Sequence, residues 1–452
     1  MVRGLKNTLS VLTALALAVL LAACSHQEPR EEILKVYNWG DYIDEDMLAK
    51  FPEWYHQQTG KRIRVIYQTF DINEIMLTKI ERGHEDYDVV CPSEYIIERM
   101  MRKDLLLPID TCFGKTPNYI KRNISPYIVA QFDGIKCRGK KASDYAVGYM
   151  WGTAGILYNT AYVKCSEAQT WGTLWNPKFK GKLLMKDSYR DCYGTALIYA
   201  RREDLKSGKT TVKNLMNDYS PQSIALVEKY MKRLKPNIEG WEADFGKETM
   251  TKGKALLNMT WSGDAVWAIE EAQKVGVKLD YQVPVEGSNV WFDGWVIPKY
   301  SRNPKAAAYF INYLCRSDVA LANMETTGYV SSVATPDVLQ AMDDSEAWPE
   351  ERDLSYLFGE GGSRAHLNPI MYPSENVVAR CAMIHDAADS TPQVLDMWTR
   401  VKGDNLGGGI AMFLILAFST AAVWMGYKKY LRKKHRELSR KHRRHHVVKA
   451  QG

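Results

Sequence analysis

The chain has 452 residues, of which 46% are hydrophobic and 25% are charged, and this composition excludes a disordered or low-complexity chain. The length is sufficient for two or three units that each bury a core. The net charge of +7 comes from the two ends, because subtracting +10 for the last 25 residues and +2 for Arg3 and Lys6 leaves −5. The acidic remainder favours cationic partners.

The N-terminus has the pattern of a secretory signal over residues 1–23, in which Arg3 and Lys6 precede a run of small and aliphatic residues. The run ends in Leu-Ala-Ala-Cys, which resembles a bacterial lipobox. Cys24 is therefore expected to become the lipid-modified first residue, followed by a polar tether (24–32). An uncleaved N-terminal anchor is the alternative.

From residue 33 onward, strand-like and helix-like patterns alternate. Runs typical of strands lie at 33–39, 63–70, 87–93, 254–261, 279–284 and 290–298, and helical patterns lie at 45–60, 72–83, 94–104, 262–274, 304–315 and 317–328. This alternation predicts an α/β fold with largely parallel sheets.

Ligands of open α/β sheets bind outside the carboxyl ends of the strands. Four such ends carry an aromatic residue, an acid or both: Asn38-Trp39-Gly40-Asp41-Tyr42, Pro92-Ser93-Glu94-Tyr95, Trp261-Ser262-Gly263-Asp264 and Trp291-Phe292-Asp293. Aromatic faces attract organic cations, and carboxylates accept their N–H donors. Four junctions of this kind indicate one binding site for such a cation.

The stretch NVWFDGWVIP (289–298) shows the pattern most clearly, because Asp293 lies among Trp291, Phe292 and Trp295. An unpaired carboxylate is costly in a core strand, and so much aromatic surface is unusual on an exposed one. We interpret the stretch as an aromatic box around an acid. An edge strand with one wet face is the alternative.

At the C-terminus, an apolar run from Ile410 to Tyr427 predicts a transmembrane helix over 408–427. The tail that follows, 428–452, has eleven Lys and Arg and one acid. The positive-inside rule therefore predicts a cytoplasmic tail, with the rest of the chain on the periplasmic face of the bacterial cytoplasmic membrane. A basic run beside a membrane span is more often a topology anchor than a nucleic-acid site, so no nucleic-acid partner is expected.

The sequence contains no catalytic or metal-binding motif. The FGKT and SGKTT segments lack the upstream glycine of a P-loop, and the cysteines show no C-x-x-C or Cys/His spacing. We therefore expect no enzyme activity, no metal and no cofactor. A glycosidase that uses paired carboxylates and Trp platforms is the alternative from another class.

Seven of the eight cysteines follow Cys24. An odd number in an exported domain cannot all pair within the chain, and most are expected to be small core residues. A disulfide between Cys112 and Cys137 is the alternative for an oxidising compartment.

Seven motifs resemble, in the same order, those of the spermidine/putrescine substrate-binding proteins of bacterial ABC importers. They are VYNWGDYI, YQTFDINEIMLTKI, YDVVCPSEYIIERM, YMWGTAGILYN, NMTWSGDAVW, VWFDGWVIP and ETTGYV. The resemblance covers about residues 33–402. It implies a two-lobed type II periplasmic-binding fold, with crossover strands near 148–152 and 292–296 and hinge closure on the ligand.

With the ends removed, the resemblance implies a first lobe of residues 33–150 and 296–340, and a second lobe of 151–295 and 341–403. Its motifs carry ligand-binding roles over to Trp39, Asp41, Tyr42, Ser93, Tyr95, Asp191, Trp261, Asp264, Trp291, Asp293 and Tyr329.

The sequence departs from the family pattern in two places, one that bears on which polyamine is preferred and one that bears on the membrane anchor. Ser188 stands where spermidine-preferring members have an extra acid, and Trp-Ser-Gly-Asp resembles the putrescine-preferring branch, so putrescine is favoured over spermidine. The C-terminal span is outside the usual pattern. The sequence thus predicts a membrane-tethered polyamine receptor that works with ABC permease subunits, with a receptor or sensor for another cationic solute as the alternative.

Overall fold

A computed structural model describes residues 29–243 and 245–403. The chain separates into two units after Pro392, and the second unit is described only over 393–403, within helix α19 (Thr391–Gly403).

Several predicted features of the two ends lie outside the described residues: the signal 1–23, Cys24, the span 408–427 and the tail 428–452. Of the predicted tether, only residues 29–32 are described. No helix in the described part of the chain is long and apolar enough to cross a bilayer.

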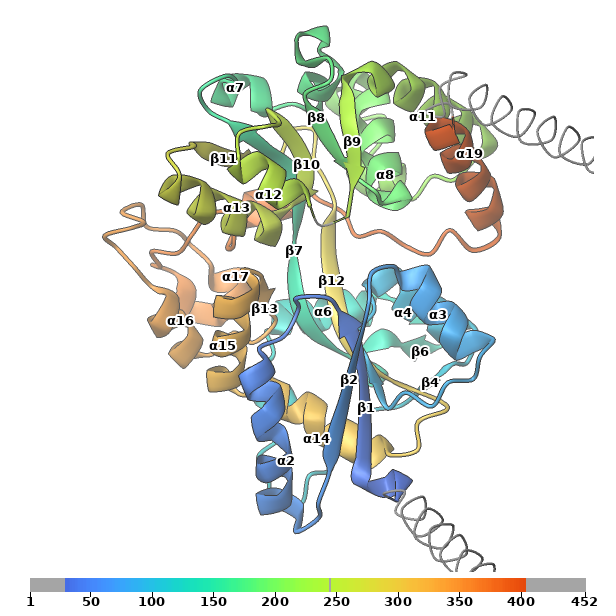
Figure 1. The fold of residues 1–452 in the computed structure, drawn as a ribbon, viewed down its shortest axis with the longest axis vertical. Helices are drawn as coiled ribbons and strands as arrows, with labels where there is room; N and C mark the ends of the chain where they lie inside the picture. Colours follow the sequence, from blue (N-terminus) through green and yellow to red (C-terminus); the bar gives the residue numbers. More distant parts are fainter. Residues whose placement is uncertain (1–28, 244, 404–452) are drawn as a thin grey trace, which may run out of the picture. The chain divides into compact units, whose positions relative to one another are not determined.

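One mixed sheet runs through both lobes of the first unit (Figure 1). Within the described residues it has eleven strands, eight of them in the order β2-β1-β3-β12-β7-β10-β8-β9. Strands β2 and β3 run parallel to β1, and strands β10 and β9 run parallel to β8. Strands β7 and β12 run antiparallel to each other. The expectation of largely parallel sheets is therefore wrong at the centre, because β12 returns along β7 from one lobe to the other. The strands are β1 (Ile33–Trp39), β2 (Arg64–Phe70), β3 (Val89–Val90), β4 (Leu106–Leu107), β7 (Ala146–Asn159), β8 (Leu183–Lys186), β9 (Ile238–Glu242), β10 (Leu257–Trp261), β11 (Leu279–Gln282), β12 (Val290–Pro298) and β13 (Val330–Ser331), with a separate hairpin of β5 (Lys136–Cys137) and β6 (Lys140–Lys141).

Helices cover the sheet in both lobes (Figure 1). The first lobe contains α2 (Glu45–Thr59), α3 (Asn73–Glu81), α4 (Glu94–Arg102), α5 (Tyr119–Asn123), α6 (Pro126–Gly134), α14 (Pro304–Leu314), α15 (Ser317–Thr327) and α16 (Pro336–Met342). Helix α17 (Ser355–Phe358) packs against α6. The second lobe contains α7 (Cys165–Ala168), α8 (Tyr189–Ala200), α9 (Arg202–Lys206), α10 (Val212–Met216), α11 (Pro221–Leu234), α12 (Gly246–Thr251) and α13 (Ser262–Lys274). Helix α18 (Glu375–Ala379) follows on the way to the end of the unit.

Helix α2 begins and ends at capping residues, and aromatic packing on its buried face holds it in the first lobe. The Asp44 carboxylate caps its N-terminus by accepting hydrogen bonds from two backbone N–H groups, and Gly60 ends it with φ +71°. On its buried face, Phe51 packs edge-on against Phe310 with ring centroids 5.0 Å apart, and Trp54 contacts Tyr313 at 5.1 Å. These aromatic contacts fasten α2 to α14 in the first lobe.

Strands β7 and β12 are the crossovers between the lobes, as predicted near 148–152 and 292–296 (Figure 1). Every residue of both strands is buried, in agreement with their mostly apolar sequences, and the buried polar exceptions include Thr153 in β7 and Asp293 in β12. Their register slips at Asp293, since Phe292 pairs with Trp151 but Gly294 pairs with Gly148. This β-bulge releases Asp293 from the ladder with β7, and Asp293 instead bridges to Ser93.

The residues from 341 on, expected in the second lobe, contact both lobes. The Ser125 hydroxyl donates a hydrogen bond of 2.7 Å to the Leu357 carbonyl, and so ties α17 to the start of α6. Further on, Ala382 bridges to Asn289 beside β12. The expected lobe boundaries stay a prediction.

The seven described cysteines are free, so Cys112 and Cys137 form no disulfide. Cys91, Cys192 and Cys315 are buried, as expected of small core residues.

Candidate functional site

The predicted ligand residues come from strand ends and helix starts in both lobes. Trp39 and Trp261 end β1 and β10, Ser93 precedes α4, and Trp291 and Asp293 belong to β12. Asp41 and Tyr42 follow β1, Tyr95 lies in α4, Asp191 in α8 and Asp264 in α13, and Tyr329 precedes β13. This distribution agrees with the rule that open α/β sheets bind ligands at the carboxyl ends of their strands.

Asp293 is a buried carboxyl that forms no ion pair with any residue that the structure describes. Its side chain is 7% exposed, and Oδ2 accepts a hydrogen bond of 2.9 Å from the Tyr42 hydroxyl. Oδ1 accepts no hydrogen bond in the described part of the chain. Burial raises the pKa of Asp293 to about 6, although the Ser93 and Tyr42 hydroxyls oppose the shift. A cation bound at this carboxylate would therefore supply a positive charge that the described residues around it lack.

Two further acids complete an acid cluster, which we define as Glu94, Asp191 and Asp293. Glu94 is 1% exposed; its Oε2 accepts the Phe292 N–H at 3.1 Å, and its Oε1 has no partner among the described residues. Asp191 accepts a hydrogen bond of 3.2 Å from the Asn289 amide. Burial raises the pKa of both acids, and the neighbouring acids of the cluster raise the pKa of Glu94 further. The three buried acids repel one another, although the charge of Lys186 opposes the rise in the pKa of Asp191. Together they favour binding of a cation.

Asp264 differs, because Lys186 already neutralises it. The Lys186 Nζ lies 2.7 Å from Asp264 Oδ2 and 3.1 Å from Glu242 Oε1, and its side chain is 1% exposed. Burial alone would raise the pKa of Asp264, but the charge and hydrogen bond of Lys186 lower it below its usual range. Lys186 also lies over the Trp261 ring, 4.2 Å from its centroid. A protein cation thus contacts Trp261 and Asp264, two of the second-lobe residues that the sequence assigned to the ligand.

Aromatic rings line the contact between the lobes. Tyr329 packs edge-on against Tyr42 and Trp291, with centroids 5.3 and 5.4 Å apart. The Tyr329 hydroxyl donates a hydrogen bond of 2.8 Å to Asp264 Oδ1. Gly263 permits this approach, since a Cβ there would lie 2.3 Å from the Tyr329 ring. The glycine of Trp-Ser-Gly-Asp is thus required for the two lobes to close.

Ser93 and Tyr95 share a donor, because the Asn73 amide contacts the Ser93 hydroxyl at 3.1 Å and the Tyr95 hydroxyl at 2.7 Å. The Arg190 guanidinium lies 3.9 Å from the centroid of the Tyr95 ring and pairs with Glu74. Arg190 belongs to α8 of the second lobe, so this stacked ion pair crosses between the lobes.

Trp39 and Asp41 lie at the first-lobe rim. Trp39 packs on Phe70 with centroids 4.6 Å apart, and its indole N–H is buried with no partner in the described part. Asp41 is exposed on a turn, with φ +50°.

Sequence reasoning missed four residues that the structure places at this site: Glu94, Lys186, Arg190 and Asn289. Glu94 lies within the strand-end junction Pro92-Ser93-Glu94-Tyr95, and Asn289 is the first residue of the NVWFDGWVIP stretch, so both had a sequence signal. Lys186 and Arg190 gave no signal, because a Lys at a strand end and an Arg in a helix are ordinary surface residues.

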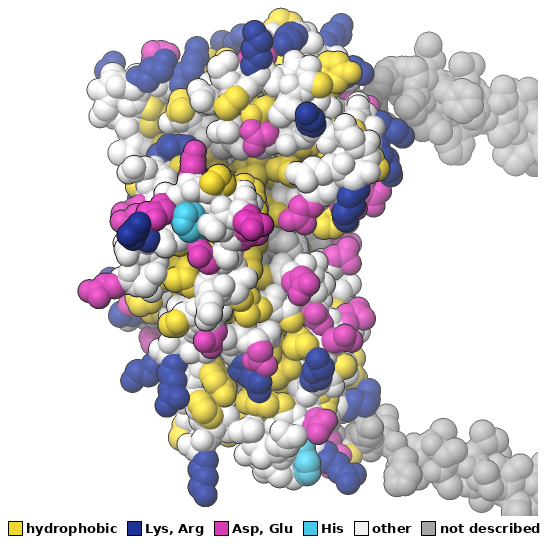
Figure 2. All heavy atoms as spheres, turned by 90° about the vertical axis from the view of Figure 1, so that its left-hand side faces the viewer, with side chains coloured by type: hydrophobic (Ala, Val, Ile, Leu, Met, Phe, Trp, Pro, Cys, Tyr) yellow, Lys and Arg dark blue, Asp and Glu magenta, His cyan; other side chains and the backbone are white. Residues whose placement is uncertain are grey.

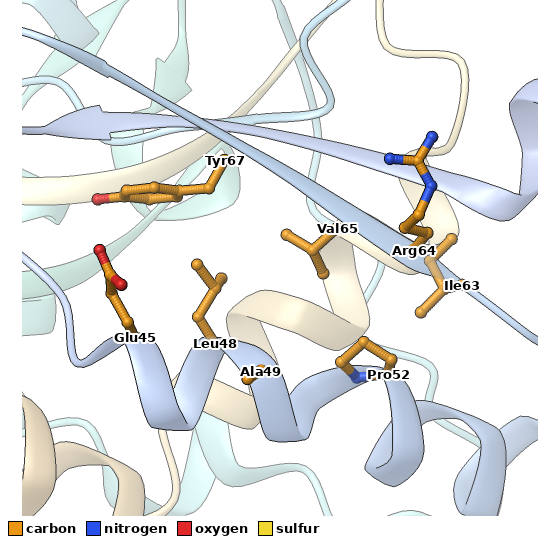
Figure 3. A pocket seen from close by; sticks show the side chains of 8 residues that line it. All are labelled: Glu45, Leu48, Ala49, Pro52, Ile63, Arg64, Val65 and Tyr67. Atoms are coloured by element: carbon orange, nitrogen blue, oxygen red, sulfur yellow. The ribbon is translucent and has the colours of Figure 1, made fainter.

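A surface groove of ≈ 520 Å³ lies elsewhere, between α2 and the edge strand β2 (Figure 3). The residues that line it are Glu45, Leu48, Ala49, Pro52, Ile63, Arg64, Val65 and Tyr67. None of them is a predicted ligand residue. On the face drawn in Figure 2, Asp and Glu side chains gather at mid-height, and Lys and Arg are more frequent toward its upper and lower edges. This distribution of charge favours the approach of cations toward the middle of that face.

Two α/β lobes, two crossover strands, and acids and aromatic rings buried between the lobes together define a solute-binding receptor of the periplasmic type. Comparison with protein families agrees, since the model of bacterial extracellular solute-binding proteins matches residues 47–352. The chain belongs to this family.

Its relatives include polyamine receptors. The chain is 30% identical over 350 residues to the spermidine/putrescine-binding periplasmic protein of Salmonella typhimurium, covering 76% of this chain and 90% of that protein. It is 28% identical over 345 residues to the putrescine-binding periplasmic protein PotF of Escherichia coli, covering 73% and 86%. Among solved structures, the substrate-binding protein PotD of the spermidine/putrescine ABC transporter of Streptococcus pneumoniae matches with a TM-score of 0.60 at 29% identity, covering 82% of this chain and 98% of that one.

These comparisons confirm the resemblance to the spermidine/putrescine substrate-binding proteins and the two-lobed fold that it implied. Proteins of this family are transport receptors rather than enzymes, so the glycosidase alternative is set aside.

Proposed function

We propose that the chain is the extracytoplasmic polyamine-binding receptor subunit of an ABC importer and that it takes putrescine or spermidine. The acid cluster carries this proposal, because Glu94 and Asp293 each hold a buried carboxyl oxygen without a hydrogen-bond partner in the described part of the chain. An ammonium group supplies the missing positive charge and N–H donors. The rings of Trp291, Tyr42 and Tyr329 suit the cation and the methylene chain behind it.

Titration of intrinsic tryptophan fluorescence tests the proposal. Putrescine and spermidine should each give a saturable change, because Trp291 adjoins the acid cluster, and a neutral oligosaccharide should give none. A response to the sugar and not to the amines would overturn the proposal. Saturation by a different organic cation, with no response to either polyamine, would favour the alternative receptor or sensor for another cationic solute.

Putrescine is the proposed preference within the polyamines. Ser188 caps α8 through its hydroxyl and stands where spermidine-preferring relatives are expected to carry an acid. The receptor would then have one carboxylate fewer for the additional amine of spermidine. Calorimetric titration with both amines tests this preference, and equal affinities would contradict it.

The eleven predicted residues are proposed as the ligand contacts, with the lobe boundaries that the resemblance implies. Alanine substitutions of Trp39 and Asp41 test the outer part of this set, since both lie at the first-lobe rim. Unchanged affinity in both variants would remove them from the ligand contacts.

Membrane tethering is proposed from the two ends of the sequence: lipid on Cys24, a span over 408–427 and a cytoplasmic tail at 428–452, with the permease subunits as partners in the same membrane. Cys24→Ala should abolish metabolic labelling by a fatty acid while the span keeps the protein in the membrane. Release of that variant in soluble form would refute the span. Protease added outside intact spheroplasts should leave the tail uncut, and cleavage of the tail would refute the topology.

A further inference from the structure

Lys186 occupies the place at which a diamine would be expected to bind the second lobe. Its ammonium contacts Asp264 at 2.7 Å and lies 4.2 Å from the centroid of the Trp261 ring. A carboxylate and an aromatic face are the two groups that recognise an alkylammonium. The side chain of Lys186 thus makes the contacts that the second ammonium of a ligand would make.

The sheet register holds Lys186 in this place. Lys186 ends β8 and pairs in parallel register with Glu242, the last residue of β9. Neighbouring residues of a ladder point to the same face, so the two side chains meet. The Nζ also donates a hydrogen bond of 3.0 Å to the Ala243 carbonyl. With Asp264, Glu242 and this carbonyl, all three N–H donors of Lys186 have a partner.

Both carboxylate oxygens of Asp264 have partners within the protein, and Lys186 neutralises its charge. Its Oδ2 contacts Lys186 and the Thr260 hydroxyl at 3.4 Å, and its Oδ1 accepts the hydrogen bond from Tyr329. Asp293 and Glu94 each keep an oxygen without a partner in the described part of the chain. The site is therefore asymmetric: among the described residues Asp293 and Glu94 have no ion-pair partner, whereas Asp264 is paired with Lys186, whose charge also acts on Asp191.

We propose that Lys186 determines specificity as a built-in replacement for one ligand ammonium, so that the site requires one cationic end of the ligand and accepts a neutral, hydrogen-bonding group at the other. The ligand class is a linear amine with at least one free ammonium, which includes a polyamine that is acylated at one end. This inference rests on the proposed polyamine function.

The test compares putrescine with N-acetylputrescine by calorimetric titration of the full chain in mild detergent. The wild-type protein should bind the two amines within about threefold of each other. In Lys186→Met, the ammonium of putrescine can take the place of Nζ, and the affinity for putrescine should rise at least tenfold relative to N-acetylputrescine.

A second variant keeps the test valid if Lys186→Met does not fold. Lys186→Met with Glu242→Gln removes one cation and one acid, so the buried net charge is unchanged while Asp264 loses its partner. Its preference should shift toward putrescine in the same way. Lys178→Met is the matched control, because Lys178 pairs with Glu167 at the surface and its loss should leave the ratio unchanged.

The outcomes separate the two proposals. A wild-type preference of more than tenfold for putrescine, unchanged in the double variant, would overturn the role of Lys186 and leave the polyamine receptor intact. Failure of both amines to bind the wild-type protein would overturn the proposed function and the inference with it.

Discussion

The Tyr329 hydroxyl donates a hydrogen bond of 2.8 Å to Asp264 Oδ1, and so joins the first lobe beside β13 to α13 of the second lobe. Because the bond bridges the two lobes, we expect it to stabilise their closed arrangement. Tyr329→Phe should therefore weaken ligand binding by about 1.5–3 kcal/mol, the usual range for a hydrogen bond to a charged group. Calorimetric titration with putrescine measures the loss.

Tyr356→Phe is the matched control for Tyr329→Phe. It also removes a hydroxyl that donates at 2.8 Å, but to the Pro373 carbonyl and not to a residue of the site. Equal affinities of the two variants would show that the bond from Tyr329 does not contribute to closure.

Asp293→Asn tests the charge at the centre of the acid cluster while it preserves the shape of the side chain. A ligand ammonium would then be buried without this counter-charge, which should cost roughly 2–5 kcal/mol of binding, or a factor of tens to thousands in affinity. Asp104→Asn removes an exposed acid that pairs with Arg138 and should change affinity little. Near-wild-type binding by Asp293→Asn would make the acid structural.

The same variant should change the pH dependence of stability in the ligand-free protein. Because the pKa of Asp293 is raised from 3.8 to about 6, the folded protein holds this proton to a higher pH than the unfolded chain does. Its contribution is fully present below about pH 4 and is lost as the pH rises through 6. Asp293→Asn should thus gain roughly 3 kcal/mol of unfolding free energy relative to wild type between pH 4 and pH 7.

Urea denaturation at several pH values measures this difference. Glu94 and Asp191 titrate with the same sign in both proteins, because burial raises the pKa of both. Loss of the Asp293 charge also lowers the pKa of Glu94 in the variant, which adds to the difference in the same direction. A wild-type-to-variant difference that stays constant with pH would refute the raised pKa of Asp293.

Arg190→Lys tests the ion pair that crosses between the lobes. Lysine keeps the charge that faces Glu74 but loses the planar group that stacks on Tyr95. Affinity for putrescine should fall about fivefold, which corresponds to a cation–π contact of roughly 1 kcal/mol. Arg202→Lys is the control, since Arg202 stacks on Tyr199 within the second lobe at 4.6 Å. Equal affinities would assign the Arg190 contact to folding rather than closure.

The sequence by itself determined the class of protein and most of the elements. Periodicity and capping residues predicted α2, α13, α14 and α15 close to their observed bounds, because these signals act over a few neighbouring residues. Strand-end aromatics and acids marked six residues that contacts now link, directly or through a neighbour: Tyr42, Ser93, Trp261, Asp264, Trp291 and Asp293. The family resemblance added Asp191 and Tyr329, which contact members of the same set.

Only the tertiary structure decided which of these acids has an ion-pair partner among the described residues. Asp264 and Asp293 are both acids beside a tryptophan in the sequence, yet the register of β8 and β9 brings Lys186 to the former, and a β-bulge turns the latter toward Ser93. The pKa of a carboxyl depends on burial and on charges within a few ångströms, and both come from strands far apart in the chain. A lysine at a strand end therefore becomes a candidate determinant of specificity only once its neighbours are known.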